Sequence, residues 1–550
     1  MLLRRIRIEN FRAVRRISLP LEDTTVLVGE NGSGKTSVLD ALGICLGPTS
    51  EPTRFHFEER DFRRMNREGE ECHPVSIRLE FSEREPGEWP GDVVERLKLA
   101  ASKEKGGRLA LHWEIRACWN GETRTAETEW AFLDSAGRIM QQADDPSLPA
   151  ALRELCPFLL LGEDPERSRN GPDGNGPDGG ARSAEGLLRR RGWTSEELEQ
   201  ATLEIWQKLA SGWDSLSDED LAAGRAVSAQ IWKRVIRRAR DERDPRRRNA
   251  RERLPSGGAQ SLAPLLVFGA FLHAQGAEKQ PVGAPLLAFD QIEVGLHPAT
   301  LGAVWRVLDS VPGQKLVSTY SGEVLAAAPL HSLRRMVRAG DRTRVHRFEG
   351  HSVSHEDLRR LRYHIRALRG GALFDRCWLL VEGETEFWLL PELARICGYD
   401  FASEGISCVE FAQCGLPPIL SLAGSLGIDR HVLVDGDSAG RDYAKSAEDA
   451  LGAEAAADVV TRLPVLDIET YLWESGYDGV YRAAAGRSKR VEQRRSHEKS
   501  RSVISKAIRS RSKPYLALSV VEACAARGPS GVPPLLRRVI EQVVRAARAG

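Results

Sequence analysis

Residues 24–46 read TTVLVGENGSGKTSVLDALGICL: an apolar strand-like run, a glycine-rich turn and a helix-forming run in direct succession. The turn fits the phosphate-binding pattern GxxxxGK[ST], which requires this strand-to-helix setting. In such a loop the backbone N–H groups and the helix N-terminus surround the phosphates, the lysine reaches the β- and γ-phosphates and the hydroxyl helps to hold Mg²⁺. We therefore predict a site for ATP with Mg²⁺ that is formed by Gly29, Asn31, Gly32, Gly34, Lys35 and Thr36.

Two downstream segments add candidates to this nucleotide site. Residues 286–298 read LLAFDQIEVGLHP, an apolar run typical of a buried strand that ends in a carboxylate. This run resembles the Walker B region, whose carboxylate orders Mg²⁺-bound water, and the resemblance implies that role for Asp290. Residues 315–325, KLVSTYSGEVL, form a second strand-like run, and Tyr320 follows it directly.

The run IRIENFRAVRRISL at 6–19, which leads into the glycine-rich turn, resembles the N-terminus of SMC/RecF-like ABC ATPases. In that family, the SGGAQS stretch at 256–261 would be the signature motif, whose Ser256 and Gly258 cap the γ-phosphate held by the opposite subunit. The resemblance therefore implies that two heads pair, as in a homodimer. Gln291 stands where the family has the glutamate that polarises the attacking water, and Tyr320 stands at a histidine position. Because loss of a general base costs about 10²–10⁴ in rate, we expect ATP binding with slow hydrolysis, unless Glu293 substitutes as the base.

A second group of acidic residues follows strand-like runs near the C-terminus. Residues 377–386, CWLLVEGETE, place Glu382 at a strand end and Glu386 on the first helical turn, so that both can face the same point. Residues 430–437, RHVLVDGD, end in Asp435 and Asp437. A third run at 462–469, RLPVLDIE, is expected to be a strand that brings Asp467 and Glu469 to one side.

These acids predict a metal site. The carboxyl ends of parallel strands meet at one edge of a sheet. Clustered carboxylates repel unless a cation neutralises them, and hard oxygen ligands suit Mg²⁺ or Mn²⁺.

The glutamate after one strand and the DxD after a later strand resemble the Toprim pattern. A Toprim unit after an SMC-like head resembles the OLD (overcoming lysogenisation defect) endonucleases, most closely their second class. The resemblance implies a DNA endonuclease that uses two metal ions, with Glu382 and Glu386 on one and Asp435 and Asp437 bridging or holding the other. Asp467 and Glu469 would be supporting ligands.

The resemblance to the OLD endonucleases also implies a basic residue that supports the cut phosphate. Lys513 is the candidate for this residue and Lys506 is the alternative. The resemblance further implies a superfamily-1 (UvrD-like) helicase partner and a role in phage defence or DNA repair.

The expected fold is α/β: an ABC-type head with a helical dimerisation insert, followed by a Toprim domain with a helical C-terminal part. We expect five segments: the first part of the head at 1–164, the linker and insert at 165–245, the second part of the head at 246–350, a connector at 351–373 and the Toprim domain at 374–550. A RecF- or SMC-like DNA clamp without nuclease activity is the alternative. It leaves the ordered acids after residue 377 unexplained.

The amino-acid composition indicates the cellular compartment of the protein, but it does not indicate its activity. Lys and Arg (79) nearly balance Asp and Glu (78), so only local charge can indicate DNA contacts. The basic segment 487–513 is the first candidate, whereas the run 234–253 is interleaved with acids, which favours a solvated helix face or linker over a path for DNA. Nine cysteines without a CxxC pair indicate reduced thiols in a cytoplasmic protein, and no apolar run reaches membrane-spanning length.

Overall fold

The structure, a computed structural model, describes residues 1–161, 285–486 and 496–549, apart from gaps at 48–50, 52, 64–71, 105, 141–144, 295–297, most of 299–312, 341, 351–352 and 368–369. The chain forms two compact units, Met1–His346 and Arg347–Gly550. The predicted dimerisation insert, the signature residues Ser256 and Gly258 and the basic run 234–253 lie outside the described residues, as does 487–495 of the basic segment.

The first unit contains an antiparallel sheet with the order β2-β1-β4-β6-β5, in which β7 also pairs with β6. Its strands show the two-residue alternation of a half-buried sheet: in β4 the apolar side chains of Val75, Ile77, Leu79 and Phe81 are buried and the intervening residues are more exposed. The strands are β1 (Leu2–Phe11), β2 (Val14–Pro20), β4 (Val75–Ser82), β5 (Ala101–Lys103), β6 (Leu109–Asn120) and β7 (Thr125–Leu133).

The second sheet of this unit carries the nucleotide-site strands, in the order β12-β11-β3-β10-β9-β8. From β11 to β8 neighbouring strands are parallel, so that β3, β9 and β10 end at the same edge. The strands are β3 (Thr24–Gly29), β8 (Phe158–Leu161), β9 (Leu286–Phe289), β10 (Gln314–Ser318), β11 (Leu333–Ala339) and β12 (Arg342–Arg347). The helices of the unit are α1 (Lys35–Leu46), η1 (Glu59–Asp61), α2 (Gly91–Leu97), α3 (Ser147–Leu155), α11 (Gly322–Ala327) and η6 (Leu330–Ser332).

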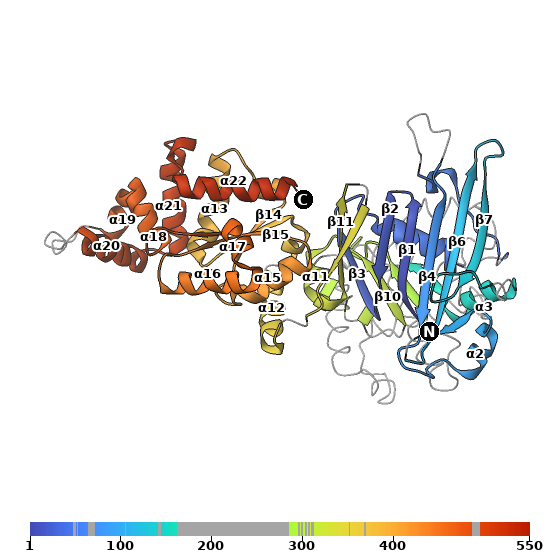
Figure 1. The fold of residues 1–550 in the computed structure, drawn as a ribbon. Helices are drawn as coiled ribbons and strands as arrows, with labels where there is room; N and C mark the ends of the chain where they lie inside the picture. The colour runs from blue at the N-terminus through green and yellow to red at the C-terminus, as the bar shows by residue number, and fades with distance from the viewer. Residues whose placement is uncertain are drawn as a thin grey trace, which may run out of the picture. The chain divides into compact units, whose positions relative to one another are not determined.

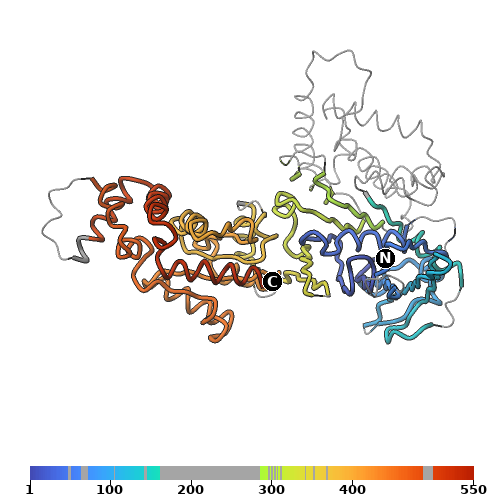
Figure 2. Tube along the Cα trace, turned by 90° about the horizontal axis from the view of Figure 1, so that it is seen from above, coloured from blue at the N-terminus to red at the C-terminus, as the bar shows by residue number. Residues whose placement is uncertain are grey.

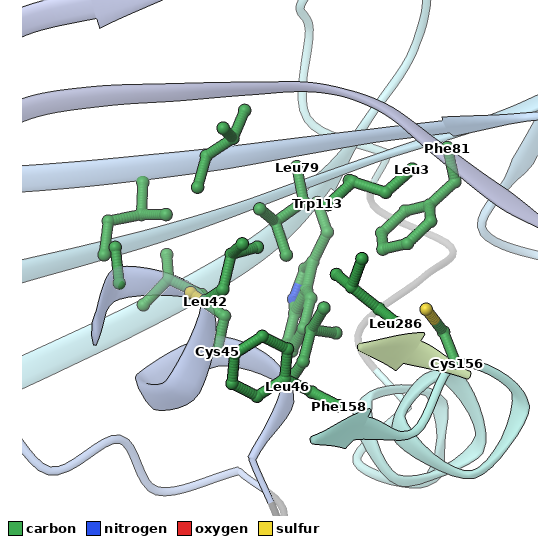
Figure 3. Close-up of a cluster of buried hydrophobic side chains, with 14 of the residues drawn as sticks. Leu3, Leu42, Cys45, Leu46, Leu79, Phe81, Trp113, Cys156, Phe158 and Leu286 are labelled. Carbon is green, nitrogen blue, oxygen red and sulfur yellow. The ribbon is translucent and has the colours of Figure 1, made fainter. Parts of the chain in front are cut away.

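One continuous apolar core joins the two sheets of this unit. Figure 3 shows Trp113 of β6 among Leu42 and Leu46 of α1 and Phe158 of β8. Helix α1 therefore packs between the sheets with Val38, Leu39, Leu42 and Cys45 fully buried. Burial of this helix fixes the position of the glycine-rich turn at its N-terminus.

The second unit is built on a four-stranded parallel sheet with the order β14-β13-β15-β16. Its strands are β13 (Cys377–Val381), β14 (Ile406–Glu410), β15 (Asp429–Val434) and β16 (Val460–Arg462). Helix α22 (Pro534–Ala549), red in Figures 1 and 2, packs across β13, β14 and β15. Helices α15 (Leu416–Ser425) and α16 (Ser438–Leu451) contact β15 from the other side of the sheet in Figure 1.

The remaining helices of this unit make its C-terminal part largely helical. They are α12 (His355–Ala367), η7 (Gly371–Phe374), α13 (Glu384–Ile396), α14 (Phe401–Glu404), α17 (Ala453–Val459), α18 (Ile468–Leu472), the π-helical turn η8 (Trp473–Tyr477), α19 (Asp478–Ala485), α20 (Ser496–Ser510), α21 (Lys513–Ala525) and η9 (Pro529–Gly531). None of the described helices combines the length and apolar composition needed to cross a bilayer. Both units mix strands and helices, and the second has a helical C-terminal part, so the predicted α/β fold class is confirmed.

The predicted third strand at 462–469 is wrong. Strand β16 ends at Arg462, and Asp467 is the N-cap of α18, where its side chain accepts a hydrogen bond from the Thr470 backbone N–H at 2.7 Å. Pro464 cannot donate to a ladder of strand hydrogen bonds, and the aspartate offers the backbone a helix start instead. Asp467 and Glu469 therefore come from a helix N-terminus, not from strand alternation.

Candidate functional site

The glycine-rich turn follows β3 and leads into α1. Gly32 and Gly34 have positive φ angles of 76° and 99°, which favour glycine. Gly34 is also closely packed, because a Cβ there would lie 2.6 Å from Cγ2 of Val14. The turn that the sequence pattern requires is therefore enforced by backbone conformation and by the neighbouring β1–β2 turn.

Lys35 is held inside this turn. Its Nζ donates to the carbonyl oxygens of Gly29 at 2.6 Å and Glu30 at 3.0 Å. The ring of Tyr320 lies over the ammonium, with 4.1 Å from Nζ to the ring centroid. Burial lowers the pKa of Lys35 to about 8, although Asp290, Glu293 and Glu30 act in the opposite direction.

The predicted magnesium pair of the head is assembled from residues far apart in the sequence. Thr36 Oγ1 lies 3.3 Å from Asp290 Oδ2, and Ser318 Oγ donates to Asp290 Oδ1 at 2.6 Å. A hydroxyl beside a carboxylate at the phosphate loop is the oxygen donor set that Mg²⁺ prefers. These residues fit the ATP–Mg²⁺ role predicted for them.

Gln291 and Glu293, which follow β9, also form hydrogen bonds with β10 and with the segment after it. Gln291 has a φ of 54°, and its backbone N–H donates to the Ser318 carbonyl at 3.1 Å. Glu293 accepts from Thr319 Oγ1 at 2.8 Å and from the Tyr320 backbone N–H at 2.5 Å. Both oxygens of Glu293 thus hold the segment after β10, which is a structural role alongside its predicted role as a substitute base.

The second site lies at the carboxyl edge of the parallel sheet in unit two. Glu382 follows β13 and Asp435 follows β15, and these strands pair in register at Val381 and Leu433. The Asp435 backbone N–H donates to Glu382 Oε2 at 3.4 Å. Gly436 permits this edge to close, because a Cβ there would collide with the carbonyl oxygens of Val465 and Leu463. The segment that leads to Asp467 is thereby packed against the VDGD turn.

The electrostatics of this edge are those of a crowded carboxylate cluster. Burial raises the pKa of Asp435 to about 8, and the charges of Glu386, Glu382, Asp467 and Glu469 reinforce the shift. Burial and the charge of Glu469 raise the pKa of Glu386 to about 7. Asp435 Oδ1 is buried and accepts no hydrogen bond from any group that the structure describes. An unpartnered buried carboxylate oxygen among other carboxylates favours a cation at this position.

Asp437, Asp467 and Glu469, by contrast, each accept a hydrogen bond from a nearby donor. Asp437 caps α16 by accepting from the Gly440 N–H at 2.8 Å, just as Asp467 caps α18. Glu469 accepts from Thr385 Oγ1 at 2.8 Å. As the described side chains stand, no three Asp, Glu, His or Cys residues converge closely enough to hold an ion together. Local hydrogen bonds hold Asp437, Asp467 and Glu469 in these positions, and the assignment of individual metal ligands stays a prediction.

Lys513 contacts this cluster. It begins α21, and its Nζ lies 3.4 Å from Glu469 Oε1. Partial burial by itself would lower the pKa of Lys513, but Glu469, Glu386 and Asp435 outweigh it and raise the pKa. Lys506, the alternative candidate, lies on the preceding helix α20.

Three further residues belong to this edge and have no counterpart in the sequence prediction. Glu410 ends β14 in register with Val381, and its pKa is raised by burial and by Glu384. Thr385 holds Glu469, and the Tyr481 hydroxyl is buried near the acids, which together with burial raise its pKa. The run ISCVE at 406–410 could have indicated Glu410 as another strand-end acid. No sequence pattern around Tyr481 on α19 indicates that its hydroxyl lies near the acids.

Comparison with known proteins is consistent with this two-part organisation. Residues 1–372 match the family model described as "Protein of unknown function (DUF2813)", and residues 373–437 match the model described as "Overcoming lysogenization defect protein-like, TOPRIM domain". The chain is 35% identical to the Escherichia coli K12 protein described as "Uncharacterized protein YbjD", over 100% of this chain and 99% of that protein.

Two other similarities are more limited. The chain is 39% identical to the protein described as "OLD nuclease" of Thermus scotoductus over 61 residues, which are 11% of this chain and 12% of that protein. The SMC head domain from Thermotoga maritima aligns with 64% of this chain and 100% of its own, at 16% identity and a TM-score of 0.31. The chain therefore belongs to the DUF2813 family, and the predicted Toprim domain of the overcoming-lysogenisation-defect type is confirmed by the match at 373–437.

Proposed function

We propose that this protein is a metal-dependent DNA endonuclease coupled to an ABC-type ATP-binding head. The observation that carries the proposal is Asp435, whose buried Oδ1 is unpartnered among the described groups and whose pKa is raised by the charges of four other acids, Glu382, Glu386, Asp467 and Glu469. Such a carboxylate edge beside a lysine is suited to phosphodiester chemistry with a divalent cation. The OLD nuclease of Thermus scotoductus, similar over 61 residues, is a relative whose name agrees with this activity.

The donor set fits Mg²⁺ or Mn²⁺, because it consists of carboxylate oxygens without sulfur or imidazole. Glu382 and Glu386 would hold one ion, and Asp435 and Asp437 would bridge to or hold a second, with Asp467 and Glu469 in support. When bound, the ions would activate water and stabilise the leaving oxygen. Lys513 would hold a phosphate oxygen of the DNA at the edge where it now contacts Glu469.

In the head, Lys35, Thr36 and Asp290 would bind ATP with Mg²⁺, and two heads would pair in a homodimer through Ser256 and Gly258. We infer slow hydrolysis, because Gln291 cannot accept a proton as a carboxylate does and both Glu293 oxygens hold the segment around Tyr320. A helicase partner and a role in phage defence or DNA repair stay predictions from the resemblance.

The test is cleavage of supercoiled plasmid by the full chain with Mg²⁺ or Mn²⁺, with and without ATP. We expect nicking or cutting that chelation abolishes and that Glu382→Gln abolishes as well. Glu392→Gln on α13, the helix that begins two residues after Glu382, is the matched control, because it removes only an ion pair with Arg395 at the surface and should leave cleavage unchanged.

Each outcome of this experiment is informative. Cleavage that survives in Glu382→Gln would refute the site. A wild-type protein that binds the plasmid with ATP but never cuts it would favour the clamp without nuclease activity.

A further inference from the structure

The corner between α20 and α21 presents an exposed aromatic side chain on the helix that Lys513 begins. Tyr515, on the first turn of α21, is 50% exposed. The guanidinium of Arg511 lies over its ring, 5.1 Å from the centroid. Leu518, one turn later on the same helix, is also exposed, at 40%. The ring is therefore supported on one side by a cation and open to solvent elsewhere.

This corner is strongly basic. Residues 500–515 contain five basic side chains and no acidic one; they are Arg501, Lys506, Arg509, Arg511 and Lys513. The side chains of Arg509 and Arg511 are exposed, and neither forms an ion pair with a described acid. A basic surface with an embedded aromatic ring is complementary to a nucleic acid strand, since phosphates meet the cations and a base can stack on the ring.

The position of the corner connects it to the proposed cleavage site. Lys513 contacts Glu469, and Tyr515 lies two residues further along the same helix, about 3 Å along its axis and turned about 200° around it. A strand that passes from Lys513 around the N-terminal end of α21 would thus bring a nearby nucleotide to the Tyr515 ring, on the side where Arg511 lies. A paired base in a duplex has both faces covered by its neighbours, so only an unpaired base can use the ring.

We propose that Tyr515, backed by Arg511, stacks an unpaired base next to the phosphate that is cut, so that the substrate is DNA with a single-stranded segment at the cleavage point. This inference rests on the proposed nuclease function for its location. It adds a substrate class, single-stranded or locally unpaired DNA, which the acidic cluster alone does not define.

The test measures binding without cleavage. The full chain is titrated, in the presence of chelator, against a fluorescein-labelled single-stranded oligonucleotide and against the duplex of the same sequence. Base–aromatic stacking predicts that Tyr515→Ala weakens single-strand binding about tenfold and duplex binding less than about twofold. Tyr515→Phe keeps the ring and should bind as the wild type does.

The matched control is Tyr363→Ala, which removes an even more exposed tyrosine, at 72%, from helix α12 of the same unit. It should change neither affinity. A second readout uses 2-aminopurine in the single strand, whose fluorescence should be quenched by the wild type and Tyr515→Phe but not by Tyr515→Ala.

The proposal is overturned if Tyr515→Ala leaves single-strand affinity unchanged, as a protein-docking role for the ring would predict, or weakens both substrates equally. Circular dichroism confirms that the variants fold. Because binding is measured without metal, absence of plasmid cleavage would refute the nuclease and not the stacking, and loss of stacking would leave the nuclease intact.

Discussion

Lys35 in the head and Asp435 in the Toprim unit both have a pKa of about 8, for opposite reasons. Burial lowers the pKa of the lysine, but three acidic groups around it partly restore the charged form. Burial raises the pKa of the aspartate, and every carboxylate that acts on it raises the pKa further. The charges of the head site therefore partly balance one another, whereas the acidic edge has one nearby lysine for several acids and keeps an excess of negative charge among the described residues.

The difference agrees with the ligands proposed for each site, phosphates in the head and divalent cations at the acidic edge. A balanced loop with backbone donors accepts an anion, the phosphates, without large rearrangement. A carboxylate edge with excess negative charge is costly until cations neutralise it. Variants of the two sites should therefore fail in different and separable ways.

The largest effect is expected for Asp435→Asn. Loss of groups that merely orient metal ligands costs about 10–100-fold, so removal of the central carboxylate should lower plasmid cleavage more than about 100-fold. Nucleotide binding, followed with a fluorescent ATP analogue, should stay unchanged. Asp442→Asn, at an exposed position on α16, is the control that should cut normally. If Asp435→Asn still cleaves plasmid, the acidic edge is not the metal site that the comparison with the head implies.

Gln291→Glu should raise the rate of ATP hydrolysis by the head, whereas Asp435→Asn lowers an activity. A carboxylate at this position supplies a base, and such groups contribute at least about 100-fold. Steady-state phosphate release should rise by that order, while Gln291→Ala stays at the wild-type rate. Brisk wild-type turnover, or no gain in the glutamate variant, would show that another residue is the base.

Lys35→Ala should weaken nucleotide binding by about 10–100-fold, which corresponds to the loss of charge-assisted hydrogen bonds. Equilibrium titration with the ATP analogue measures it, and Lys103→Ala on β5 serves as the control. Metal binding at the acidic edge, followed by calorimetry with Mn²⁺, should not change. If Mn²⁺ affinity falls as well, the two sites are not separable.

The smallest effect concerns stability against pH without metal. The folded-state pKa of Asp435, about 8, lies above its unfolded value of 3.8, so its contribution to the free energy of unfolding is present at low pH and is lost as pH rises toward 8. In chelator, Asp435→Asn should therefore melt a few degrees above the wild type near pH 8, and about equally near pH 4. A difference that is independent of pH would contradict the excess negative charge.

Several features of these sites follow from local sequence. The glycine-rich turn and Lys35 lie in one uninterrupted segment, and Glu382 and Asp435 each follow an apolar run directly. The prediction at 462–469 was wrong because the apolar alternation of LPVLDI outweighed Pro464, although the proline removes a strand donor. Glu410 was missed because its importance depends on β14 being the neighbour of β13, which no local pattern records.

The sequence by itself determined the chemistry: the phosphate loop, the strand-end acids and the family to which the chain belongs. These depend on residues a few positions apart, whose backbone geometry is set locally by glycine, proline and helix capping. Only the tertiary structure decided which of these groups meet. Thr36 lies 254 residues from Asp290 and Thr385 lies 84 residues from Glu469, and Lys513 reaches the acids whereas Lys506 belongs to the preceding helix. The physical reason is that such contacts are fixed by strand order and by burial of the apolar faces between them, which depend on the whole chain.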